Sequence, residues 1–133
     1  MDTLINASAR GDTEAILQFL SDPCVNVNQT DNGGWTPLHW ASRNGREECV
    51  RILLAHGANV NQPINFGWTP LHLASRSGRK ECVEILLALA DYGANVYQPS
   101  NDGWTQLDVG NNHMKEFIQE YMDSMIIKEP DQF

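Results

Sequence analysis

The sequence predicts an all-α solenoid, in which helix-turn-helix units with short β-hairpin-like turns stack in one row. One segment recurs: Trp35-Thr-Pro-Leu-His-Trp-Ala-Ser42 returns 33 residues later as Trp68-Thr-Pro-Leu-His-Leu-Ala-Ser75. A divergent copy, Trp104-Thr-Gln-Leu-Asp-Val-Gly110, follows 36 residues after that. A fixed period near 33 indicates stacked repeats, each too small to bury its own apolar face. With 133 residues, four such units fill a single domain.

Each unit begins with a turn and a first helix. The turn tripeptides combine Asn and Gly, which tolerate the positive φ of tight turns. They are Asn32-Gly33-Gly34, Asn65-Phe66-Gly67 and Asn101-Asp102-Gly103. Thr36 and Thr69 are placed to cap the helix that follows, with Pro37 and Pro70 in its first turn.

The second helix follows a glycine break at Gly45 or Gly78 and ends near Gly57 or Gly93. Apolar positions with helical spacing form the expected core in both middle units. They are Leu38, Ala41, Val50, Leu53 and Leu54, repeated as Leu71, Ala74, Val83, Leu86 and Leu87. Cys49 and Cys82 share one phase of the repeat and are expected to be small, buried core residues.

The predicted boundaries are an N-terminal cap over residues 1–31, full repeats over 32–64 and 65–100, a C-terminal cap over 101–127, and a tail over 128–133. The third unit has three extra residues near Leu89, which we expect to lengthen its second helix. The last unit departs from the pattern, with Gln106 in place of the proline and Asp108 in place of the histidine.

The Thr-Pro-Leu-His-x-Ala strings, the matching Gly-Arg-x-Glu-Cys-Val-x-Ile-Leu-Leu segments and the Gly-Ala-Asn-Val segments agree in phase. In these motifs the chain resembles a small four-repeat ankyrin protein over about residues 3 to 125. The resemblance implies partner binding through a concave surface made by hairpin tips and first helices. It also implies that His39 and His72 tie adjacent repeats together.

The resemblance places the residue after each turn glycine on that concave surface, and here it is Trp35, Trp68 and Trp104. Tryptophan is a common hot-spot residue, so we expect a ladder of three across a binding groove. The other candidates at contact phases are Phe66, Arg43, Arg76, Asn32, Asn65 and Asn101. The equivalents of Trp40 are Leu73 and Val109, so we expect Trp40 to pack between helices.

Charge and motifs exclude several function classes. The net charge of −8 argues against nucleic acid as a generic partner. It divides into −4 over residues 1–31, +1 over 32–99 and −5 over 100–133. No apolar run reaches membrane-span length, no secretory signal is evident, and three cysteines do not suggest a disulfide framework. No catalytic, cofactor or metal motif is recognisable. We therefore expect a monomer without cofactor, in the cytoplasm or nucleus.

These observations favour a non-enzymatic module that binds another protein, as a stand-alone inhibitor or an adaptor. A rival is a substrate role, because the resemblance implies that hairpin asparagines can be hydroxylated. Asn28 and Asn61 are the best candidates, each with a leucine eight residues earlier. A second rival is a cysteine-dependent enzyme using Cys49 or Cys82 with a nearby histidine.

Overall fold

The computed structural model describes residues 2–88, 116 and 119–120. Residues 2–88 contain six helices: α1 (Leu4–Arg10), α2 (Thr13–Leu20), α3 (Pro37–Asn44), α4 (Glu47–Ala55), α5 (Pro70–Arg76) and α6 (Lys80–Ala88). The two helices of each successive pair pack against each other. The predicted all-α solenoid of helix-turn-helix units is therefore confirmed.

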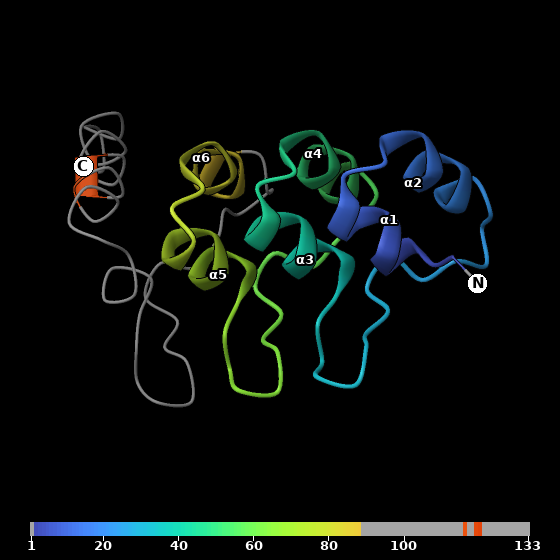
Figure 1. Cartoon of the computed structure of the whole chain (residues 1–133), viewed down its shortest axis with the longest axis horizontal. Coiled ribbons are helices and arrows are strands. Elements are labelled where there is room, and N and C mark those ends of the chain that lie inside the picture. The colour runs from blue at the N-terminus through green and yellow to red at the C-terminus, as the bar shows by residue number, and fades with distance from the viewer. Residues whose placement is uncertain (1, 89–115, 117–118, 121–133) are drawn as a thin grey trace, which may run out of the picture.

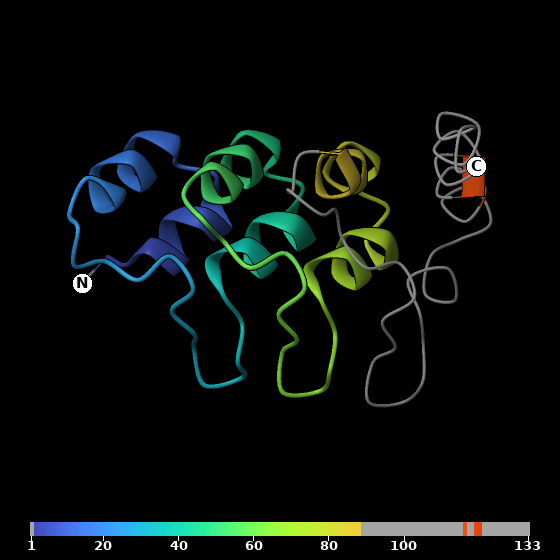
Figure 2. The same ribbon diagram turned by 180° about the vertical axis from the view of Figure 1, so that it is seen from behind.

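The three pairs stand side by side in two layers. In Figure 1, α1, α3 and α5 form one layer and α2, α4 and α6 form the other. Contacts run along each layer, from α1 to α3 to α5 and from α2 to α4 to α6. Figure 2 shows the stack from behind, with the loops before α3 and α5 extending away from the second-helix layer. The hairpin loops and the first helices thus share one side of the molecule.

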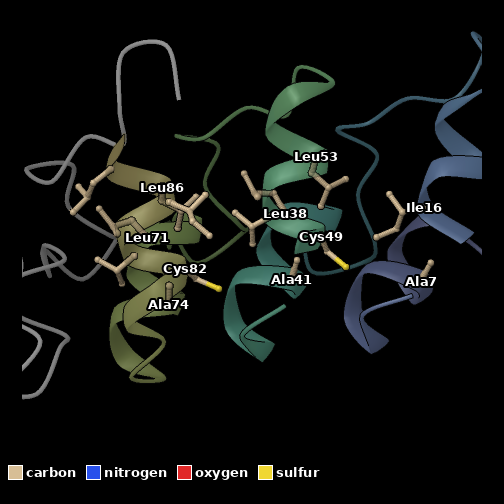
Figure 3. Close-up of a cluster of buried hydrophobic side chains, with 14 of the residues drawn as sticks. Ala7, Ile16, Leu38, Ala41, Cys49, Leu53, Leu71, Ala74, Cys82 and Leu86 are labelled. Atoms are coloured by element: carbon tan, nitrogen blue, oxygen red, sulfur yellow. The ribbon is translucent and has the colours of Figure 1, made fainter. Parts of the chain in front are cut away.

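The core lies between the two layers and continues from unit to unit. Figure 3 shows Ala7 and Ile16 of the first unit, followed by buried side chains of the next two units, among them Ala41 and Leu53, then Ala74 and Leu86. Nearly all predicted core positions are buried, including Cys49 at 1% and Cys82 at 0% exposure. Leu54 is the exception, because it is only partly buried. Helical spacing alone does not explain this difference, because the equivalent Leu87 of the third unit is buried, with 7% exposure.

Side chains from one repeat reach back to the preceding helix end. Arg46 Nε donates to the Ala9 carbonyl at 3.2 Å, and Arg79 Nε donates to the Arg43 carbonyl at 3.1 Å. The glycine between the helices permits this approach, because a Cβ at Gly45 would lie 2.9 Å from Arg79 Cδ. Two equivalent arginines therefore connect successive units, a contact that the repeat pattern alone does not indicate.

Other predictions fall outside the described residues. They concern the insertion near Leu89, Gly93, Gln106, Asp108 and the C-terminal cap over 101–127, of which only residues 116 and 119–120 are described, as helix. In the described part of the chain, no helix has the length and apolar character needed to cross a membrane.

Candidate functional site

The first helices are positioned by a paired threonine and histidine. The Thr36 N–H donates to His39 Nδ1 at 3.0 Å, and the His39 N–H donates to Thr36 Oγ1 at 3.3 Å. Thr69 and His72 repeat these two bonds at 3.0 and 3.3 Å. This reciprocal cap satisfies backbone donors that a helix start otherwise leaves open. The predicted capping role of both threonines is confirmed.

His39 also joins its helix to the segment that leads into the next hairpin. Because Nδ1 accepts a hydrogen bond from the Thr36 N–H, Nε2 carries the ring hydrogen and donates to the Gln62 carbonyl at 2.8 Å. Burial lowers the pKa of His39 from 6.5 to about 4, against the opposing effect of that carbonyl. The imidazole is therefore neutral near pH 7 and serves as a structural connection between α3 and the segment that leads into the next hairpin.

The hairpins are tied to each other at their tips. Within each hairpin, the Asp31 N–H donates to the Trp35 carbonyl at 3.0 Å, and the Ile64 N–H donates to the Trp68 carbonyl at 2.9 Å. Between hairpins, the Asn65 N–H donates to the Gly33 carbonyl at 3.0 Å. Gly34 has φ +82°, and a Cβ there would lie 2.5 Å from Asn65 Oδ1. Glycine thus allows the close approach that fixes the spacing of the two loops.

A groove of about 580 Å³ lies between the second and third units. Its described walls are Trp35, Arg43, Ile64, Phe66, Trp68, Leu73, Arg76 and Ser77. Ile64 and Leu73 are buried, with 6% and 8% exposure, whereas Phe66 is 73% exposed. The two tryptophans are partly buried and the two arginines are exposed. The groove therefore combines an apolar interior with an aromatic and basic rim.

Five candidate residues from the sequence meet in this groove. They are Trp35, Trp68, Phe66, Arg43 and Arg76. Asn32 and Asn65 are exposed on the hairpins but do not belong to the groove's described walls. The Asn65 side chain instead donates to the Asn32 carbonyl at 3.2 Å. Trp104 and Asn101 lie outside the described residues, so the third rung of the ladder stays a prediction.

Each arginine of the groove lies over a tryptophan ring. Arg43 Cζ is 5.9 Å from the ring centroid of Trp40, and Arg76 Cζ is 5.7 Å from that of Trp68. A guanidinium at this distance is attracted by the negative face of the ring. Neither arginine forms an ion pair within the described residues. The two positive charges are thus held near the groove, and no acid of the described residues pairs with them.

Trp40 corrects one expectation, because it is not buried between helices. It is partly exposed, and its ring centroid lies 4.5 Å from that of Trp35. Its indole Nε1–H donates to Asp31 Oδ2 at 3.0 Å, while Asp31 Oδ1 accepts the N–H groups of Gly33 and Trp35 at 3.0 Å each. Asp31 thereby draws the indole to the hairpin. The sequence held a signal for this pair, because Asp31 and Trp40 are both replaced by apolar residues one unit later.

The cysteines do not support the enzyme alternative. Burial raises the pKa of both core thiols, that of Cys49 and that of Cys82, the latter to about 12. A buried thiol that stays protonated at neutral pH is a poor nucleophile. Residues 2–88, with the three described later ones, contain no group of three His, Cys, Asp or Glu side chains that could hold a metal.

The two candidate hydroxylation sites are partly buried in the hairpin segments. Asn28 Oδ1 accepts the Asn59 N–H at 2.8 Å, and Asn28 Nδ2 donates to the Gly57 carbonyl at 3.4 Å. The Asn61 N–H donates to Asn59 Oδ1 at 3.1 Å. Modification of Asn28 or Asn61 stays a prediction, and it fails if peptides from protein made in a eukaryotic host carry no added oxygen.

Comparison with known proteins agrees with the repeat geometry. A model of ankyrin repeats in three copies matches residues 4–100. Among curated proteins, the chain is 37% identical to the palmitoyltransferase akr1 of Schizosaccharomyces pombe over 57 residues, which is 43% of this chain and 9% of that protein. It is 37% identical to the human scaffold protein ILK, also over 57 residues, covering 43% and 13% of the two chains.

A third relative is the human 2-5A-dependent ribonuclease, 46% identical over 55 residues that cover 41% of this chain and 7% of the ribonuclease. The chain thus matches only a small part of the length of these relatives. Ankyrin repeats generally mediate protein–protein interaction and are not themselves catalytic. With the family model matching most of its length and the stacked helical pairs in place, this chain belongs to the ankyrin repeat family.

Proposed function

We propose that this chain is a non-enzymatic module that binds another protein through the groove between its second and third units, as a stand-alone inhibitor or an adaptor. The observation that carries the proposal is the convergence of Trp35, Trp68, Phe66, Arg43 and Arg76 on one groove. Tryptophan and arginine are enriched among residues that dominate binding energy.

The size of the groove is suited to anchoring side chains of a partner. Its volume of about 580 Å³ lies within the range of roughly 300–1,000 Å³ that is typical of ligand sites. A stable protein interface buries about 800 Å² on each partner, so the groove would form the centre of a larger contact. The neighbouring hairpin tips and first helices supply the surrounding surface.

The relatives support a role for the repeats in association rather than in chemistry. They are named as a palmitoyltransferase, a scaffold protein and a ribonuclease, yet each is matched over 13% of its length or less. The catalytic activities in two of these names therefore do not carry over to this chain. The scaffold protein is the relative whose named role agrees with an adaptor. We expect the chain to act as a monomer in the cytoplasm or nucleus.

Changing Trp68 to Ala tests this proposal most directly. The partner is first identified by affinity capture from the native source, with a Trp35→Ala, Trp68→Ala and Trp104→Ala triple variant as the background. The affinity of the purified partner for wild type and Trp68→Ala is then measured by calorimetry. We expect a loss of 2 kcal/mol or more, roughly thirtyfold, for a central hot spot.

Two controls accompany the measurement. Helical circular dichroism and the unfolding midpoint establish that the Trp68→Ala protein is folded. Leu17 is an exposed apolar residue of α2, in the other helical layer, so Leu17→Ala should bind as the wild type does. A folded Trp68→Ala protein with unchanged affinity would place recognition elsewhere on the molecule.

A further inference from the structure

We infer that the groove selects an acidic protein segment that carries one large apolar side chain. That side chain lies between Trp35 and Trp68, and neighbouring carboxylates contact Arg43 and Arg76. The inference rests on the proposed function and names the chemistry of the partner, which is a different protein rather than a second copy of this chain.

Recognition of the partner's apolar side chain depends on residues of the third unit. Ile64 and Leu73 line the groove and are almost completely buried, so they form its apolar floor. Phe66 projects from the hairpin with 73% of its surface exposed. An apolar side chain of the partner placed beside Phe66 would remove its own surface and that of Phe66 from water, which favours association. This geometry fits an aliphatic or aromatic anchor.

Recognition of the partner's acidic residues depends on Arg43 and Arg76, which belong to the last turns of α3 and α5. Their positions over the Trp40 and Trp68 rings restrict the side chains before a partner arrives. Less side-chain entropy is then lost on binding. The planar guanidinium also matches a carboxylate through paired hydrogen bonds. A partner with acids beside its apolar anchor would therefore satisfy both charges.

Charge is segregated between the two sides of the stack. Over residues 32–88, every acid lies in a second helix: Glu47 and Glu48 in α4, and Glu81 and Glu84 in α6. The hairpins and first helices of the same stretch contain Arg43 and Arg76 and no acid. Asp31, just before them, has its carboxylate engaged by Gly33, Trp35 and Trp40. The groove side thus favours a negatively charged partner and disfavours a basic one.

The experiment is a selection of short peptides from a random displayed library on the full chain. The most enriched peptide is synthesised with a fluorescent label, and its affinity is measured by anisotropy. We expect Asp or Glu close to Phe, Trp, Leu or Ile, and an affinity that falls as salt is raised. The Arg43→Glu, Arg76→Glu double variant should bind at least about tenfold more weakly.

A matched control and a charge exchange sharpen the result. Arg51 lies in α4 and pairs with Glu48 at 3.3 Å, so Arg51→Glu has the same change of charge per site on the other helical layer. This variant should bind as the wild type does. A peptide in which lysine replaces each acid should not bind the wild type, but it should bind the Arg43→Glu, Arg76→Glu double variant.

The outcomes separate this inference from the proposed function. If the enriched peptides are neutral or basic and bind Trp68→Ala more weakly than the wild type, the inferred acidic specificity is wrong, but the groove is still a binding site. If the enriched peptides are acidic but bind Trp68→Ala and the Arg43→Glu, Arg76→Glu variant as well as the wild type, both this inference and the proposed function are wrong. A concentration-dependent dimer that dissociates in the arginine variant would overturn the choice of a different protein. Failure to enrich any peptide would also count against the inference.

Discussion

The second and third units have the same backbone but present different surfaces. Both begin their first helix with the Thr–His cap, and both carry a tryptophan after the turn glycine. In the second unit, Asp31 binds the Trp40 indole and brings it beside Trp35. In the third unit the equivalent positions are Ile64 and Leu73, which are buried and line the groove.

The turn itself shows a further difference. The middle residue is Gly33 in one hairpin and the exposed Phe66 in the other. The shared residues therefore build the stack, whereas the residues that differ shape the groove. This division teaches that stability and recognition are assigned to different positions of one repeat, so the two properties can be tested by separate substitutions.

The largest expected effect concerns the shared histidine and pH. The pKa of His39 is about 4 in the folded protein, against 6.5 ordinarily, because the ring is buried. As pH falls from 6.5 towards 4, the unfolded chain binds the proton first, so folding stability is lost over this range. The contribution of this group is on the order of 3 kcal/mol.

Urea denaturation of the wild type and of His39→Gln, from about pH 7 to about pH 4, measures this loss. The variant should be less stable at neutral pH but lose less stability on acidification. Exposed carboxylates such as Asp2 and Asp12 titrate in both proteins, so their effects cancel in the comparison. Parallel pH profiles would contradict the assigned role of His39.

The next effect compares two residues of α5. His72→Ala removes a buried side chain that accepts the Thr69 N–H, and leaving a buried polar group without its partner costs about 1–3 kcal/mol. Arg76→Ala changes an exposed side chain and should stay within about 0.5 kcal/mol. Chemical denaturation of both variants provides the test. Equal midpoints would mean that the shared cap does not stabilise the third unit.

A smaller effect tests whether Asp31 and Trp40 act as a pair. Asp31→Ile and Trp40→Leu each convert one position of the second unit to its equivalent in the third, and each breaks the bond between them. We expect the double variant to lose less stability than the sum of the losses in the two single variants. The difference, which is the coupling energy of the pair, should be about 0.5–3 kcal/mol. A denaturation cycle of the four proteins measures it, and strict additivity would argue against the pair.

The smallest expected change in stability is that of Phe66→Gly, which gives the third hairpin the residue of the second. The side chain is 73% exposed, so removal should change the unfolding free energy by only about 0.5 kcal/mol. Binding of an apolar partner segment should nevertheless weaken. Thermal unfolding and peptide anisotropy on the same sample measure the effects of the substitution on stability and on binding. A large loss of stability would instead make Phe66 part of the packing.

Local pattern explains how far the fold was predictable. Recurrence of the Trp-Thr-Pro-Leu-His segment indicated the helix starts, and the glycines indicated the helix ends, because caps and turns depend on residues close in the chain. The phase of the repeat and the resemblance also identified five residues of the groove. Packing, by contrast, separated Leu54 from Leu53, since a core edge depends on neighbouring units rather than on helical spacing alone.

The sequence by itself determined the repeat period, the capped helical pairs and the positions that face the hairpin side, because each follows from short-range spacing repeated in phase. Only the tertiary structure decided which of those side chains meet. It placed Trp40 beside Trp35 through Asp31, joined His39 to Gln62, and set Arg43 and Arg76 on one groove. These contacts join residues across a hairpin, between the two ends of one unit or between units, and their geometry depends on how the helices and neighbouring repeats pack.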